Sequence, residues 1–215
     1  MKPLLTEIQV AKYMKECVAI YHPDTGVRTI DAFVRMVDDL SDAYVENRGT
    51  PIEDHDKANS FKGDMFEVLG EIFFGEFGSD PKVGVKNYRV VPLVEDYGVD
   101  AIGTNVVGNE VAIQYKFRSN PSDAIEYSDI AKTYTAGRIR HHLPLDADDT
   151  IMVVTTCNSV NKHVKAVFGT KVRLISRDIM GANRIDNNVL FWIEAEQRVV
   201  ATINKLRMYE IASNS

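Results

Sequence analysis

The stretch that most constrains the fold of this chain is residues 96–117, DYGVDAIGTNVVGNEVAIQYKF. It contains two largely apolar runs, Val99–Ile102 and Val111–Phe117, on either side of the polar segment Thr104–Asn109. Short apolar runs that flank a turn rich in Asn and Gly are typical of two paired strands. The stretch therefore predicts two adjacent strands joined by a turn.

Strand geometry places the polar residues of this stretch. Alternate side chains of a strand point to the same face, so Gln114 and Lys116 share one face and Tyr115 points to the other. If the two predicted strands pair, Asp100 approaches Gln114 and Lys116. An acid, an amide oxygen and a lysine then meet at one point, an arrangement that suits a hard divalent cation beside a water molecule.

A second candidate acid lies on a predicted helix over residues 60–77, for which Ser60 is the expected N-cap. Glu67 and Glu71 are one turn apart on this helix, beside an apolar stripe. The stripe predicts a largely buried helix, in which an acid is costly unless it has a partner or binds a metal. Either glutamate fits this description.

The order of predicted elements indicates an α/β fold with a mixed β-sheet flanked by helices. Residues 1–48 are expected to form a helical accessory region, 49–59 a polar connector, 60–186 the core domain and 187–215 a closing helix. The predicted helices and strands are, in order, helices 4–20, 29–47 and 60–77, strands 88–93, 99–104 and 110–117, helix 121–140, strand 150–156, helix 158–168, strand 171–175 and helix 187–212.

Composition excludes some classes of protein. No apolar run approaches the roughly 20 residues that a membrane span needs, so no membrane association is expected. The two cysteines, Cys17 and Cys157, offer neither a disulfide framework nor a paired zinc motif, which favours a reducing, cytoplasmic compartment. The formal net charge of −6 does not indicate a nucleic-acid binder. However, residues 162–184 hold six basic residues and one acid, and such a local basic patch can bind phosphates.

The polar blocks together resemble the PD-(D/E)xK nuclease superfamily, and within it the Mrr-like restriction endonuclease branch, in which Gln replaces the second acid. The resemblance covers roughly residues 60–180 and implies a restriction-endonuclease-like core with αβββαβ order behind an N-terminal helical extension. It is carried by GDMFE at 63–67, DYGVD at 96–100, QYKF at 114–117, IMVVTT at 151–156 and VRLI at 172–175.

The resemblance implies a role for each residue that matches the family pattern. Asp100 would be the central ligand of a Mg²⁺ ion, for which Mn²⁺ can substitute, and Gln114 would add a neutral oxygen. The backbone carbonyl of Tyr115 would complete the ligand set. Lys116 would orient the attacking water and stabilise charge on the phosphate. Glu67, which the GDMFE block favours over Glu71, would complete the site from the helix.

The function implied is a metal-dependent DNA endonuclease of the restriction or mobile-element type, acting as a homodimer or higher homo-oligomer because cutting both strands takes two active sites. Lys162, Lys165 and Arg138 are the expected DNA contacts. Two alternatives stay open. One is a structure-specific nuclease of the same fold, such as a junction resolvase or exonuclease. The other is a non-catalytic DNA- or protein-binding module, for which the acidic N-terminal region (11 acids against 7 bases in residues 1–59) is a candidate partner surface.

Overall fold

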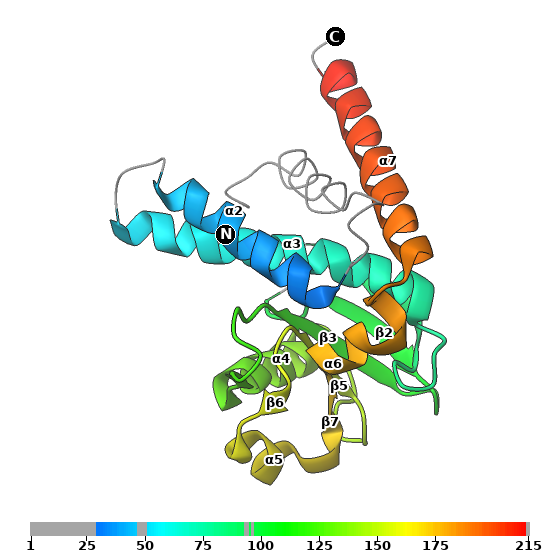
Figure 1. Ribbon diagram of the computed structural model, residues 1–215. Helices are drawn as coiled ribbons and strands as arrows, with labels where there is room; N and C mark the ends of the chain where they lie inside the picture. Colours follow the sequence, from blue (N-terminus) through cyan, green and yellow to red (C-terminus); the bar gives the residue numbers. More distant parts are fainter. Residues whose placement is uncertain (1–28, 47–50, 93–94, 96, 214–215) are drawn as a thin grey trace. The chain divides into compact units, whose positions relative to one another are not determined.

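The structure is a computed structural model that describes residues 29–46, 51–92, 95 and 97–213 (Figure 1). The predicted helix over residues 4–20, and Cys17 within it, lie outside the described residues. In the part of the chain that is described, no helix combines the length and apolar character that crossing a bilayer requires.

The chain forms two compact units. Their boundaries lie after Ile72 and Met180, whereas the predicted segments end at residues 48, 59 and 186. One unit comprises the described residues up to Ile72 together with those from Gly181 onwards, and the other comprises the described residues of Phe73–Met180. The second unit holds the sheet and the stretch 96–117.

A mixed five-stranded sheet forms the centre of the second unit and confirms the predicted mixed α/β class. The first three strands in sheet order form an antiparallel meander, and the last two add to it in parallel. In sheet order the strands are β1 (Val85–Val90), β2 (Ala101–Asn105), β3 (Glu110–Lys116), β5 (Ile151–Thr155) and β7 (Val172–Ile175).

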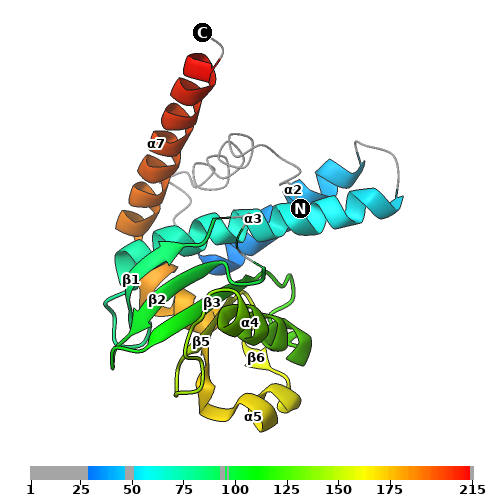
Figure 2. The same cartoon turned by 180° about the vertical axis from the view of Figure 1, so that it is seen from behind.

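Helices connect the parallel strands, because a parallel pair cannot be closed by a tight turn. Helix α4 (Tyr127–Ile139) joins β3 to β5, and α5 (Lys162–Phe168) lies between β5 and β7. A small second sheet pairs β4 (Ala124–Ile125) with β6 (Ser159–Val160). Figure 2 shows α4 running across one face of the main sheet.

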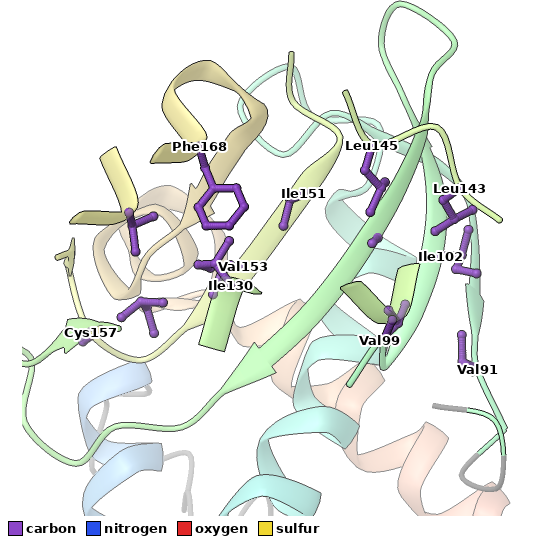
Figure 3. Close-up of a cluster of buried hydrophobic side chains, with 14 residues drawn as sticks. Val91, Val99, Ile102, Ile130, Leu143, Leu145, Ile151, Val153, Cys157 and Phe168 are labelled. Atoms are coloured by element: carbon purple, nitrogen blue, oxygen red, sulfur yellow. The ribbon is translucent and has the colours of Figure 1, made fainter. Parts of the chain in front are cut away.

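The face of the sheet beneath α4 carries an apolar cluster (Figure 3). Ile130 of α4 and Ile151 and Val153 of β5 are fully buried in it. The cluster also takes in Phe168 from α5, so both crossover helices contribute to one core. The neighbouring polar residues of β3 therefore sit on a strand that is held rigidly by packing.

Local hydrogen bonds shift the starts of two helices from their predicted positions. Helix α4 begins at Tyr127 instead of 121, because residues 124–125 form a strand and the N–H of the N-cap residue Glu126 donates to Asp129 at 3.2 Å. Helix α5 begins at Lys162 instead of 158. There the side chain of Asn161 caps the helix by accepting the N–H of His163 at 2.9 Å.

The first unit contains the three long helices α2 (Ile30–Glu46), α3 (Pro51–Phe77, whose last turn belongs to the second unit) and α7 (Val189–Ser213). The predicted helix over residues 29–47 is confirmed as α2, and it has a buried apolar face that includes Phe33, Val34 and Val37. By contrast, Ser60 does not cap α3, because the helix begins at Pro51. Residues 51–59 are thus helical and do not form a connector.

Helix α3 carries a partly buried acid, Asp64, that should make the stability of the protein depend on pH. Desolvation raises the pKa of its carboxyl from 3.8 to about 6. Between these values the folded chain binds more protons than the unfolded chain, so the free energy of unfolding falls as pH rises from about 4 to about 6. Asp64→Asn removes the charged form, and we expect it to raise stability by about 1–2 kcal/mol at neutral pH, after allowing for residual solvent contact.

Urea unfolding of Asp64→Asn and wild type at about pH 4 and about pH 7.5 checks this expectation. The gain should appear at the higher pH and largely vanish at the lower one. Asp42→Asn, a change at an exposed acid of α2, is the matched control and should give no such difference. An equal gain for Asp64→Asn at both pH values would show that the carboxylate charge is not the cause.

Candidate active site

The register of β2 and β3 determines the position of Asp100. Ala101 lies opposite Ile113 in the ladder, and the N–H of Asp100 donates to the carbonyl of Ile113 at 2.9 Å. Asp100 thus continues β2 backwards by one residue and comes next to Gln114. The pairing predicted from the stretch 96–117 is confirmed.

The carboxylate of Asp100 is buried, with 9% of the residue exposed, and two neutral groups donate hydrogen bonds to it. Its Oδ2 accepts the side-chain N–H of Gln114 at 2.5 Å and the backbone N–H of Tyr115 at 2.6 Å. A buried carboxylate without donors would be costly, so these two hydrogen bonds explain how the sheet tolerates the charge.

The side chain of Tyr115 points away from this carboxylate, as strand alternation predicts. Its hydroxyl lies 2.8 Å from that of Tyr88, and its ring meets that of Phe74 edge-on. Tyr115 thus contributes backbone atoms to the Asp100 side of the sheet and an aromatic ring to the opposite core.

The amide of Gln114 is held at both ends. Its Nε2 donates to Asp100, and its Oε1 accepts the hydroxyl of Thr133 from α4 at 3.1 Å. Thr133 is fully buried, and the same hydroxyl lies 3.1 Å from the carbonyl of Asp129. Because a hydroxyl can both donate and accept, Thr133 can pair with either end of the amide.

Lys116 lies on the same face of β3, two residues beyond Gln114, and meets a second acid. Its Nζ is 3.8 Å from Oδ1 of Asp129, while Arg118 donates to Oδ2 of the same carboxylate at 2.9 Å. The hydroxyl of Thr155 also donates to the carbonyl of Lys116 at 2.7 Å. One carboxylate on α4 thus orients two cations at the end of β3.

The donor set at Asp100 suits a hard cation but carries little charge. The described residues include no group of three or more His, Cys, Asp and Glu side chains that could hold a metal ion. Asp100 and Gln114 instead offer a carboxylate and an amide, whose oxygens are the kind of ligand that Mg²⁺ prefers. In this structure Gln114 turns its N–H towards Asp100, so a ligand role requires the amide to turn over, with Thr133 then accepting from Nε2.

The helix acid belongs to the other compact unit. Glu67 is partly buried on α3, whereas Glu71 is exposed. Both precede the boundary after Ile72, while Asp100, Gln114 and Lys116 follow it. The role of Glu67 therefore stays a prediction, as does the choice between the two glutamates.

The three predicted DNA contacts are all exposed, two on α5 and one on α4. Lys162 and Lys165 belong to the short helix α5. Arg138 of α4 forms an ion pair with Asp146 at 2.5 Å and donates to the hydroxyl of Tyr134 at 2.8 Å. Asp146 thus neutralises part of the positive charge of Arg138 within the protein.

Sequence reasoning missed Asp129, Thr133 and Arg118. Asp129 and Thr133 are four residues apart on α4, so they share one helix face, but nothing in their local sequence indicates that this face covers Gln114 and Lys116. Arg118 follows the QxK strand and could have been suspected from its charge alone.

A scan of protein-family models, a search of curated proteins and a search of solved structures each find no significant match to this chain.

The hydrogen bond between Thr133 and Gln114 yields a stability prediction. Thr133→Val keeps the shape of the side chain but leaves the buried amide oxygen of Gln114 without its donor. We expect a loss of about 1–3 kcal/mol in the free energy of unfolding, measured with urea. Thr133→Ser, which keeps the hydroxyl, should restore most of this loss, and a valine variant more stable than the serine variant would contradict the prediction.

Proposed function

We propose that this chain is a metal-dependent nuclease that hydrolyses phosphodiester bonds in DNA. The observation that carries the proposal is the convergence of Asp100 and Gln114 on adjacent strands, with Lys116 two residues further along the same face. The combination of a buried carboxylate, an amide and a cation is the one that the resemblance to the PD-(D/E)xK superfamily implies.

Each residue of the candidate site has a defined task in the proposed mechanism. When bound, Mg²⁺ supplies a Lewis acid that polarises the phosphate. Asp100 and Gln114 would hold it through their side-chain oxygens, and the carbonyl of Tyr115 is the third candidate ligand. Lys116 places its ammonium group to orient water and to stabilise the negative charge that develops on the phosphate. Asp129 positions that ammonium group, since the two side chains form an ion pair.

The proposal is tested by incubating supercoiled plasmid with the protein and Mg²⁺ or Mn²⁺. We expect nicked and linear products that EDTA abolishes. Linear product formed without accumulation of the nicked form would support a homo-oligomer with two active sites, and sedimentation measures that state directly. Preference for branched DNA or ends over intact duplex would support the structure-specific alternative. DNA or protein binding without cleavage of any of these substrates would contradict the nuclease proposal and support the binding module.

The low charge of the site predicts that metal and DNA bind cooperatively. Asp100 is the single carboxylate among the proposed ligands of the second unit, so a substrate phosphate would supply negative charge that the neutral Gln114 lacks. We expect the affinity for Mg²⁺ to rise roughly tenfold when DNA is present. Calorimetry with Lys116→Ala, which keeps the proposed ligands and should slow turnover strongly, measures the two affinities.

Gln114→Glu is the matched variant for this prediction. It adds a second negative charge at nearly constant shape, so Mg²⁺ should bind more tightly without DNA and gain less from DNA. Equal affinities with and without DNA in the Lys116→Ala protein would refute the cooperativity.

A further inference from the structure

A groove of about 520 Å³ lies between helix α4 and the turn that precedes Asp100. Its walls include the ring of Tyr97 from the turn and the side chains of Lys132, Ile139 and Arg140 from the helical segment. We propose that this groove binds an unstacked base, together with its neighbouring phosphates, from a DNA strand. The inference rests on the proposed nuclease function, and it specifies the substrate as DNA with an unpaired or extruded nucleotide near the cleaved bond.

The turn presents Tyr97 at some conformational cost. Its φ of 46° lies in the left-handed region that non-glycine residues rarely adopt, yet 52% of the residue is exposed. Burial therefore compensates little of this strain. Residues held in such conformations cluster at ligand-binding sites, where the surrounding structure enforces them.

Gly98 fixes the turn against α4. Its φ is 105°, and a Cβ at this position would lie 2.9 Å from Cε of Lys132. The aliphatic part of Lys132 thus packs directly on the glycine, and the same residue lines the groove. The ring of Tyr97 is placed by a defined contact between turn and helix.

Arg140 completes a planar binding surface. Its guanidinium group lies over the ring of Tyr97, 4.8 Å from the centroid. Both groups are flat, and bases stack on aromatic rings and on guanidinium planes alike. A base can therefore continue the stack that Arg140 and Tyr97 begin, and the exposed side chain of Ile139 adds apolar contact.

The charge of the groove matches a DNA backbone. Lys132 and Arg140 are both exposed cations, and none of the described residues that line the groove is acidic. They are eight residues apart in the helical segment, which corresponds to about 12 Å along a helix axis. Phosphates of one strand follow one another at about 3.4 Å along a duplex, so this separation spans roughly three to four nucleotides, and the two cations can contact phosphates a few nucleotides apart around the stacked base.

Anisotropy of a labelled single-stranded DNA of about 12 nucleotides tests the proposal. The measurement is made with the full chain in EDTA, which prevents cleavage. Tyr97→Leu should weaken binding by about 5- to 150-fold, the range that loss of one base–aromatic stack gives. Tyr97→Phe keeps the ring and should bind like wild type. An oligomer of abasic nucleotides carries the phosphates alone, and its affinity should be unchanged by Tyr97→Leu.

Charge variants separate the electrostatic part of the interaction. Arg140→Ala should weaken binding of both the normal and the abasic strand, whereas Lys86→Ala, which removes an exposed cation of β1 outside the groove, should affect neither. Equal binding of single-stranded DNA by Tyr97→Leu and wild type would overturn the proposal, as would undetectable binding by wild type. Metal-dependent plasmid cleavage that persists in Tyr97→Leu alongside such a result would leave the nuclease function intact.

Discussion

Replacing Asp100 with Asn is expected to lower the rate of plasmid cleavage by at least about 10²-fold, the typical cost of losing one electrostatic group in an active site. The substitution removes the negative charge of the proposed central metal ligand. It leaves a carbonyl oxygen that can still accept the N–H groups of Gln114 and Tyr115, which Oδ2 accepts in the wild type. The fold should therefore persist while metal binding and cleavage are lost.

The measurement is the rate of conversion of supercoiled plasmid at saturating Mn²⁺, with far-ultraviolet circular dichroism as a check on folding. Asp123→Asn, a change at an exposed acid just before β4, is the matched control and should cleave like wild type. Cleavage by Asp100→Asn at the wild-type rate would place the activity at another site or in a contaminant.

The second large effect is expected for Lys116→Ala, which should also slow cleavage by roughly 10²-fold or more. Lys116 is not a proposed metal ligand, so affinity for Mn²⁺ should change little while the chemical step is lost. This separation of binding from turnover distinguishes it from Asp100→Asn. Single-turnover cleavage and calorimetry on the same protein give the two quantities.

The matched control for Lys116→Ala is Lys86→Ala on the exposed edge of β1, which removes the same charge away from the site. Asp129→Asn gives a further comparison, because it removes the carboxylate that pairs with Lys116. A large rate loss in Lys86→Ala equal to that in Lys116→Ala would indicate a general effect of charge on DNA binding and would count against a specific role for Lys116.

The central pair of the candidate site could be predicted because its geometry is local. Asp100 and Gln114 are 14 residues apart on consecutive strands, so strand alternation and one turn are enough to bring them together. Thr133 contacts Gln114 across 19 residues and a change of element. Its position depends on where α4 begins, and that start was misplaced because the pairing of β4 with β6 spans a long sequence separation.

The boundaries in the first unit failed for a different reason. Residues 51–59 are polar and follow a glycine, which favoured a connector, but Pro51 is well suited to the first turn of a helix. The proline marks the true start of α3, and its conformational preference outweighs the polarity of the residues that follow. The strands of the mixed sheet were easier to predict, since β3, β5 and β7 each begin within one residue of their predicted positions.

The hydrogen bonds to Asp100 also bear on how the protein behaves when cations are scarce. Zinc fingers need their ion in order to fold, whereas here the N–H groups of Gln114 and Tyr115 already meet the buried carboxylate. Synthesis and folding of the sheet need not wait for a metal. If the proposed function holds, a chelator would silence the protein without denaturing it and returning the ion would restore it, so that metal supply would act as a reversible control on an enzyme that is already folded.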